Sequence, residues 1–294
     1  MRIVATLDRI DELARLQTAG ADALMVSVIG FSAAARTVFL PAELTDVLAA
    51  ATERDMPVYI DISSPIHEAM LPDLECQMIR WANAGAEAFV CSDLSAVAVA
   101  IRLGLADQTI YQPGTFNANL YAPWFYKRQG LRGITVSREI TLEDVVAIAV
   151  NHEGIEISFI GHGHLPMFHS RRRFLSDYRE YRGADFVWPS GSMDLFLEER
   201  ERPGRRFPIV EDATGTLLFR DRRLQSFDEA AILAPYIADF FVSRRFIADD
   251  EYDAALGVYA GRGEAKTFLD RYGASYDSGF HYRKTGLSKE GDGR

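Results

Sequence analysis

One ten-residue stretch decides the fold, because a helix ends in it, a buried strand follows, and polar residues close the strand. It reads Ala84-Gly85-Ala86-Glu87-Ala88-Phe89-Val90-Cys91-Ser92-Asp93. Glycine tolerates the left-handed conformation in which helices end, so Gly85 predicts a helix end. Four uninterrupted apolar residues are typical of a strand that is buried on both faces. A second link of the same kind, Ala19-Gly20-Ala21-Asp22, indicates that the helix-to-strand unit recurs.

Seven other short apolar runs predict buried strands. They cover residues 3–7, 23–27, 58–62, 109–111, 134–137, 155–160 and 240–243. Amphipathic segments lie between them, and their apolar residues recur at helical spacing, as in Leu44, Val47, Leu48 and Ala51. Thr141, with Asp144 three residues later, predicts a helix N-cap.

Eight strands that alternate with helices predict an α/β fold, a (β/α)8 TIM-type barrel. An open doubly wound sheet is the alternative, since the pattern alone does not show closure. We expect residues 1–260 to form one barrel domain with a large insertion at residues 162–235, after the seventh strand, and residues 261–294 to form a polar C-terminal tail. The insertion would leave the barrel at the face where barrel active sites lie.

The composition excludes several classes of protein. Of 294 residues, 48% are hydrophobic and 25% are charged, which excludes a disordered or collagen-like chain. The chain contains no run of about 18 apolar residues, so we expect no membrane span. Its first residues lack the apolar core of a signal peptide. Two cysteines cannot build a disulfide framework or a four-cysteine metal site. We therefore expect a cytoplasmic protein.

Charge is unevenly distributed along the chain. The net charge of −10 excludes a surface coated evenly with positive charge. Yet residues 170–230 hold 12 of the 32 basic residues, and all 12 are arginines. The same stretch holds 12 acids, so it is neutral and the negative charge belongs to the remainder.

Polar residues follow the predicted strands and would form a ring at one end of the barrel. They are Asp61, Ser63, Ser92, Asp93, Thr115, Asn117, Asn119, Arg138, Glu139, His162 and Arg244. Such a ring could orient a polar ligand, which apolar barrel walls cannot do. The alternative for Ser63 and Asp93 is a helix N-cap. Neighbouring strand residues face opposite ways, so either Arg138 or Glu139 should point to the barrel axis, unless the two form a surface ion pair.

Two further clusters each allow two interpretations. His162 and His164 would project to one side of an extended chain, with Glu156 in the same parity, which would suit a divalent metal. The alternative is a polar loop or substrate-contacting histidines. Arg171, Arg172 and Arg173 precede Phe174, Tyr178 and Tyr181, and together they could clamp phosphates and stack bases. The sequence alone favours a solvated arginine face with the aromatic rings turned inward.

Several ordered segments resemble one known family over about residues 15–260. They are residues 19–23, Ser92-Asp93, Asn119 with residues 121–125, and residues 137–142, 159–163, 169–178, 202–209 and 276–285. This set resembles the collagenase-like peptidase family, which is peptidase family thirty-two of unknown catalytic type. The last segment, residues 276–285, is similar to the ending of the short members of this family, which are related to tRNA hydroxylation proteins. The resemblance implies 5-hydroxylation of wobble uridine with prephenate as co-substrate.

The chain departs from the family at two positions. In many relatives, cysteines near the His-Gly segment hold an iron–sulfur cluster, whereas Pro166 and Arg173 occupy those positions here. Neither Cys76 nor Cys91 lies in that segment, and thiolates are the ligands such a cluster needs. We therefore expect no cluster or other cofactor in this chain, and a cluster-bearing paralogue as a partner. No nucleophile–base pair or zinc motif supports peptidase chemistry.

The leading hypothesis is that the chain assists tRNA wobble-uridine hydroxylation and binds tRNA and a small carboxylate. Arg138 would hold the carboxylate, and Glu139 or His162 would handle protons. The other predicted substrate contacts are Asp61, Asp93, Asn119, His164, Arg171, Arg172 and Arg173. The alternatives are a metal-assisted peptidase that uses His162, His164 and Glu156, and a non-catalytic partner of a cluster-bearing paralogue.

Overall fold

The computed structural model describes residues 1–284 and shows a closed barrel of eight parallel strands. The strands are β1 (Arg2–Leu7), β2 (Ala23–Ser27), β3 (Val58–Ile62), β4 (Ala88–Cys91), β5 (Thr109–Tyr111), β6 (Gly133–Thr135), β7 (Glu156–His162) and β13 (Asp239–Val242). β1 pairs with both β2 and β13, which closes the sheet. The predicted barrel is confirmed, and the open sheet is excluded.

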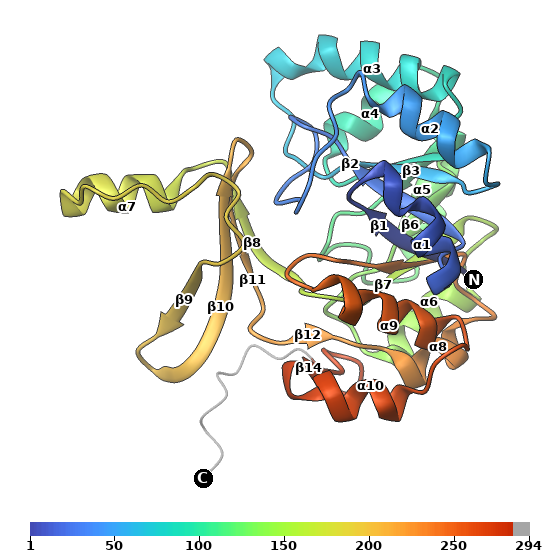
Figure 1. Cartoon of the computed structure of the whole chain (residues 1–294). Helices are drawn as coiled ribbons and strands as arrows, with labels where there is room; N and C mark the ends of the chain where they lie inside the picture. Colours follow the sequence, from blue (N-terminus) through green and yellow to red (C-terminus); the bar gives the residue numbers. More distant parts are fainter. Residues whose placement is uncertain (285–294) are drawn as a thin grey trace.

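Helices cover the outside of the barrel (Figure 1). They are α1 (Leu13–Ala19), α2 (Leu44–Thr52), α3 (Leu71–Asn83), α4 (Leu94–Arg102), α5 (Tyr121–Arg128), α6 (Leu142–Val150), α8 (Phe227–Leu233), α9 (Asp249–Tyr259) and α10 (Ala265–Tyr272). Short 3-10 turns occur at Ile10–Glu12, Glu68–Met70, Ala106–Gln108 and Gly273–Ser275. Thr141 is the N-cap of α6, as predicted. Its side chain accepts a hydrogen bond from Asp144 N–H, and the Asp144 side chain accepts one from Thr141 N–H.

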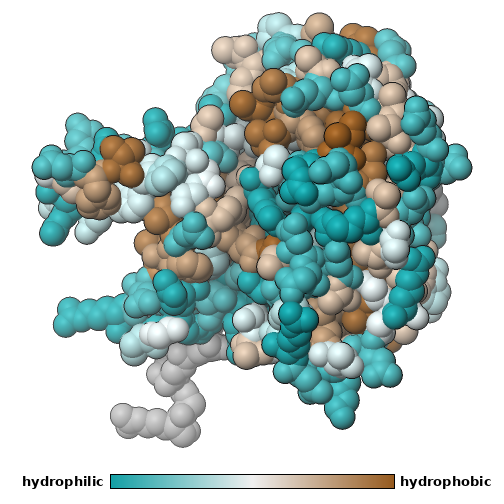
Figure 2. Space-filling model, in the orientation of Figure 1, coloured by the Kyte–Doolittle hydropathy of each residue, from teal (hydrophilic) through white to brown (hydrophobic). Residues whose placement is uncertain are grey.

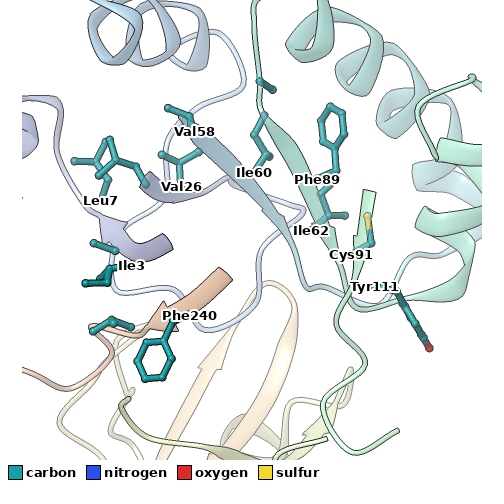
Figure 3. Close-up of a cluster of buried hydrophobic side chains, with 14 of the residues drawn as sticks. Ile3, Leu7, Val26, Val58, Ile60, Ile62, Phe89, Cys91, Tyr111 and Phe240 are labelled. Atoms are coloured by element: carbon teal, nitrogen blue, oxygen red, sulfur yellow. The ribbon is translucent and has the colours of Figure 1, made fainter. Parts of the chain in front are cut away.

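The strands are buried on both faces. Outward side chains such as Ile60, Ile62, Phe89 and Cys91 lie under the helices, as Figure 3 shows. A smaller apolar cluster fills the barrel interior. Its members are Val4, Ala23, Tyr59, Ala88, Val90, Ile110 and Phe241. The interior is therefore a packed core below a mouth at the carboxyl ends of the strands.

The segment between β7 and β13 forms an arm that stands away from the barrel (Figure 1). The arm comprises β8 (Pro166–Ser170), α7 (Phe174–Arg182), β9 (Phe196–Glu199), β10 (Arg202–Asp212) and β11 (Gly215–Phe219). Its sheet has the order β8-β11-β10-β9. Val210, Leu217 and Phe219 pack on Ala33 and Ala34 of the β2–α2 connection, which fixes the base of the arm over the barrel mouth.

Residues 261–284 pack against the barrel and the base of the arm. β14 (Tyr276–Asp277) pairs with β12 (Arg223–Leu224). The carboxylate of Asp277 accepts hydrogen bonds from both terminal nitrogens of Arg220. The backbone of His281 accepts a hydrogen bond from Leu142 N–H. The remainder of the predicted tail, residues 285–294, lies outside the described residues, as does Thr285 of the family-like ending. None of the described helices is long and apolar enough to cross a membrane.

Candidate functional site at the barrel mouth

A cavity of about 190 Å³ opens at the mouth, between the carboxyl ends of the strands and the base of the arm. Its floor is apolar and includes Met25, Ile160, Phe241 and Val242. Its walls are polar. They contain Arg36, Arg138, Arg244, Arg245, Asp8, Asp61, Ser27, Ser63, Ser92, Gln112, His164 and His169. An apolar floor with a few convergent charges is the usual character of a small-molecule site.

Arg138 is the least compensated charge on this wall. Its guanidinium lies against Gly114, where a Cβ atom would be 2.9 Å from two of its nitrogens. Nε of Arg138 is buried without a hydrogen-bond partner, and Arg138 forms no ion pair with any residue in the range 1–284. Burial lowers the pKa of Arg138, nearby Arg245 adds to the effect, and Glu139 opposes it. A carboxylate in the cavity would supply the missing partner.

Asp61 and Arg245 form a second polar wall. Ser63 and Ser27 donate to Oδ2 of Asp61 at 3.0 and 3.4 Å, and Arg245 lies 3.8 Å from the same oxygen. Arg245 also donates to the backbone carbonyls of Ala33 and Ala34. Burial raises the pKa of Asp61, whereas Arg245 and the serines lower it. This wall therefore offers both an acceptor and a cation to a ligand.

Arg244 also borders the cavity, but its charge is already neutralised. It pairs with Glu12 at 2.6 Å, with Asp249 at 2.7 Å and with Asp8 at 3.4 Å. Arg36 pairs with the same Asp8 and Asp249. These ion pairs tie β1, β13 and α9 together, so Arg244 supports the fold rather than awaiting a ligand.

His164 is fixed in one neutral form. Its Nδ1 lies 2.8 Å from the carbonyl of Arg220, which can only accept, so Nδ1 carries the proton. Nε2 then accepts from Nε of Arg223 at 3.2 Å. Burial lowers the pKa of His164 to about 4, and the neighbouring arginines contribute to the shift. Both ring nitrogens are occupied, so His164 shapes the cavity and has no free nitrogen for proton transfer.

His162 lies outside the barrel, away from the cavity. The pairing of β7 with β13 shifts register between Ile160 and His162, so both Gly161 and His162 face outward. The strict alternation of side chains, which predicted that His162 and His164 project to the same side, therefore does not hold here. The ring of His162 contacts Tyr259 and Tyr276, each at 3.2 Å. Burial lowers its pKa to about 3, and the charge of Arg223 adds to that effect.

The three residues of the alternative metal interpretation, His162, His164 and Glu156, do not come together. Glu156 begins β7 at the opposite end of the barrel from His164, and it pairs there with Arg132. Within residues 1–284, no three His, Cys, Asp or Glu side chains are grouped as metal ligands would be. Cys76 lies on the surface of α3, and Cys91 is buried at the end of β4. Burial raises the pKa of Cys91, which disfavours the thiolate that an iron–sulfur cluster would require.

Of the other predicted residues, Ser63 lines the cavity, whereas Glu139, Asp93 and Asn119 do not. Because β6 ends at Thr135 rather than at residue 137, the alternation argument for Arg138 and Glu139 does not apply. Glu139 is half-buried beside the cavity wall, and its N–H bonds Ser137. Asp93 caps α4 through Ser95 N–H, as its alternative predicted, and Asn119 accepts from Tyr121 N–H. Ser63 caps no helix and bonds Asp61 instead.

The arm exposes the aromatic residues that follow the arginine triplet. Tyr178 and Tyr181 are exposed on α7, and Tyr181 reaches 85% exposure, so the prediction that these rings turn inward is wrong. In Figure 2, hydrophobic and hydrophilic residues lie side by side at the end of the arm, where Figure 1 places α7. Arg171 donates to Pro65, and Arg173 pairs with Glu211 at 3.6 Å, while Arg172 points to solvent.

Sequence reasoning missed Arg245, Arg36, Asp8, Gln112 and His169. Asp8 and Gln112 directly follow β1 and β5, so the rule that found Asp61 could also have found them. Arg245 lies two residues after the predicted eighth strand, and the predicted polar ring included its neighbour Arg244 instead. Arg36 and His169 come from a long connection and from the arm, whose positions over the mouth depend on tertiary packing.

Comparisons with known proteins agree with one another. The model of Peptidase family U32 matches residues 8–190. The tRNA hydroxylation protein P2 of Bacillus subtilis is 28% identical over 72% of this chain and 68% of its own length. An uncharacterized protease of Methanocaldococcus jannaschii is 27% identical over 96% of this chain and 74% of its own. A solved U32 peptidase, at 15% identity, superposes with a TM-score of 0.51 and covers 82% of this chain and 92% of its own.

Proposed function

The chain belongs to peptidase family U32, and from that premise we propose that it assists the 5-hydroxylation of the wobble uridine of tRNA. The similarity to a tRNA hydroxylation protein supports this choice over proteolysis. In this proposal, a small carboxylate co-substrate binds in the cavity at the barrel mouth. The tRNA approaches the same face and is held by the arm.

The single observation that carries the proposal is the state of Arg138. The side chain of Arg138 is half-buried, but its Nε atom is buried and has no hydrogen-bond partner, and an anion in the space beside it would supply the missing acceptor. Its planar fork suits a carboxylate, and Arg245 would add a second cation on the same ligand. Asp61 would accept from a hydroxyl group of the ligand, because only one of its oxygens is engaged by Ser27 and Ser63.

The arm supports the RNA part of the proposal. Arg171, Arg172 and Arg173 directly precede α7, which carries exposed aromatic rings, and arginine with aromatic residues is the combination that grips phosphates and stacks bases. The cavity is lined in part by His169 and Leu217 of the arm, so a nucleic acid held there would lie beside the bound carboxylate.

The residues of this chain do not fit an iron–sulfur cluster, so no step is assigned to one. Pro166 and Arg173 stand at the two family positions, and Cys76 and Cys91 lie on other elements. We assign this chain the binding and orientation of the co-substrate and the RNA. A cluster-bearing paralogue would complete the reaction.

Deletion of the gene, followed by measurement of 5-hydroxyuridine-derived bases in tRNA, tests the proposal. We expect these bases to fall, and to be restored by the wild-type chain but not by Arg138→Ala. Arg54→Ala is the matched control, because Arg54 is exposed on the α2–β3 connection and far from the mouth. Unchanged hydroxylation in the deletion strain would refute the proposal.

A further inference from the structure

An exposed aromatic surface lies on the rim of the mouth across from the arm. Phe116, Leu120, Tyr121, Trp124 and Phe125, which we call the rim platform, are each between 47% and 78% exposed. They come from the β5–α5 connection and the outer face of α5. Monomeric proteins rarely expose a contiguous apolar patch of this kind unless it contacts a partner.

The local structure holds these rings outward. Asn117 adopts a left-handed conformation and donates to the Thr135 carbonyl at 3.0 Å, which anchors the connection on β6 while Phe116 projects to solvent. On α5, the inner face packs through Pro123 and Tyr126, and Tyr126 contacts Tyr111. Tyr121, Trp124 and Phe125 therefore share the opposite face.

Charge argues for a polyanion as the occupant. Residues 112–128 contain Lys127 and Arg128 but no acidic residue, in a chain whose net charge is −10. Arg128 lies 4.8 Å above the ring of Trp124, so cation and aromatic face are presented together. Four of the five side chains are aromatic, and flat rings beside an arginine are what unpaired nucleobases stack on.

The position of the rim platform relates it to the cavity and the arm. Pro113 and Gly114, at the start of the same connection, line the cavity opposite Leu217 and His169 of the arm. The arm rests on the β2–α2 connection, and β3 and β4 separate β2 from β5 around the barrel. The cavity wall thus connects the base of the arm with the segment that leads to the rim platform.

We infer that the rim platform binds unpaired bases of the RNA by stacking, while the arm holds the phosphates on the other side of the mouth. The inference rests on the proposed function and extends it: the RNA must present a single-stranded loop across the cavity. Duplex RNA would contact the arm alone.

The test uses the full chain and two probes, an RNA hairpin with a uridine-containing loop and a blunt RNA duplex. In the double variant Tyr121→Ala/Trp124→Ala we expect hairpin affinity to fall about tenfold or more, with duplex affinity unchanged. The salt dependence of hairpin binding should keep its slope, because no phosphate contact is removed. Tyr236→Ala is the matched control, since Tyr236 is 42% exposed and precedes β13 at the far end of the barrel.

Arm variants separate this inference from the proposed function. Arg171→Ala/Arg172→Ala should weaken both probes and reduce the salt slope. If they do so while the platform variant binds normally, the inference fails and the proposed function stands. If the wild-type chain binds neither probe, the RNA part of the proposed function fails as well.

Fluorescence gives an independent readout. Trp81 is fully buried, so in a Trp188→Phe variant the solvent-accessible signal comes from Trp124. Hairpin addition should quench that signal, and an unquenched signal at saturation would overturn the inference. A change of oligomeric state in Tyr121→Ala/Trp124→Ala, measured by light scattering, would assign the surface to a protein contact and also overturn it.

Discussion

The two ends of the barrel both carry clustered arginines, but at the mouth one of them, Arg138, has no ion-pair partner within residues 1–284. At the amino end of the strands, Arg2 pairs with Asp239, Glu87 and Glu156 at 2.9, 3.3 and 3.7 Å. Arg132 pairs with the same two glutamates. At the mouth, Arg138 has no such partner within residues 1–284, and Arg245 is held mainly by backbone carbonyls.

This difference distinguishes the arginines that stabilise the fold, Arg2 and Arg132, from Arg138, which we propose binds a ligand. A closed network uses its carboxylates to lock strands together, and it gains nothing from a ligand. A buried cation left open costs stability until an anion arrives, which is how binding sites commonly trade stability for function. Substitution at the closed end should therefore lower stability, and substitution at the open end should lower binding.

The largest expected effect is at the closed end. Asp239→Ala removes the buried acceptor of Arg2 and of the Tyr59 hydroxyl, which lies 2.9 Å away. We expect the free energy of unfolding to fall by about 2–3 kcal/mol, because the buried Tyr59 hydroxyl loses its acceptor, while Arg2 loses one of its three carboxylate partners. Urea unfolding measures this. A loss below about 1 kcal/mol would mean that the network contributes little.

Acid should weaken the fold through His162, which is buried outside the barrel against Tyr259 and Tyr276, and not through Asp239 at the closed end. The pKa of His162 is lowered by burial to about 3, so the folded state resists a proton that the unfolded chain accepts near 6.5. Stability should therefore fall as pH drops below about 6.5, by about 1.4 kcal/mol for each pH unit once the unfolded histidine is protonated. Asp239 has the opposite sign, because burial raises its pKa and its protonation then favours the fold.

Urea unfolding at a series of pH values checks this prediction. His162→Phe should make the dependence less steep, leaving the contributions of His164, whose pKa is lowered to about 4, and of His169 and His281, whose pKa values burial also lowers. An equally steep dependence in the variant would assign the acid sensitivity to other groups.

Arg138→Met tests the open end. Losing one charge-assisted contact should weaken binding of prephenate, used as a probe carboxylate, about 10- to 100-fold. The free energy of unfolding should stay constant or rise, because the variant removes a buried Nε atom that has no hydrogen-bond partner. Calorimetric titration and urea unfolding measure the two effects. A variant that loses stability and keeps its affinity would reverse the comparison between the two ends.

The smallest effect is expected at Gly114, which touches the same guanidinium. Its φ of +87° disfavours a side chain, and an added Cβ would lie 2.9 Å from Arg138 nitrogens. Gly114→Ala should cost about 1–2 kcal/mol in stability and displace Arg138, lowering prephenate affinity severalfold. Gly104→Ala, with φ +74° but no neighbour within 4 Å, is the control for backbone strain alone.

The barrel could be predicted from local sequence patterns. Each strand is a short apolar run, and the neighbouring helices are marked by apolar residues at helical spacing and by residues typical of helix ends, such as Gly85 and Thr141. Residues 58–62, 88–91 and 109–111 were predicted with the bounds that the structure shows. The site was predicted in part. Asp61 and Arg138 follow strands and reach the cavity, whereas His162 fails because a bulge at Gly161 breaks the alternation. The arm's sheet joins segments up to 53 residues apart, and no local period reveals such pairing.

The packing of residues 273–281 has a consequence for how the protein is made. Arg223, which holds His164 at the cavity wall, stacks on Tyr276, and Arg220 is fixed by Asp277. During translation, the barrel strands and the arm emerge before these residues do. The cavity wall can therefore reach its final form only after residue 277 has left the ribosome, so we expect a nascent chain that has already closed its barrel not yet to bind the carboxylate that we propose as its ligand.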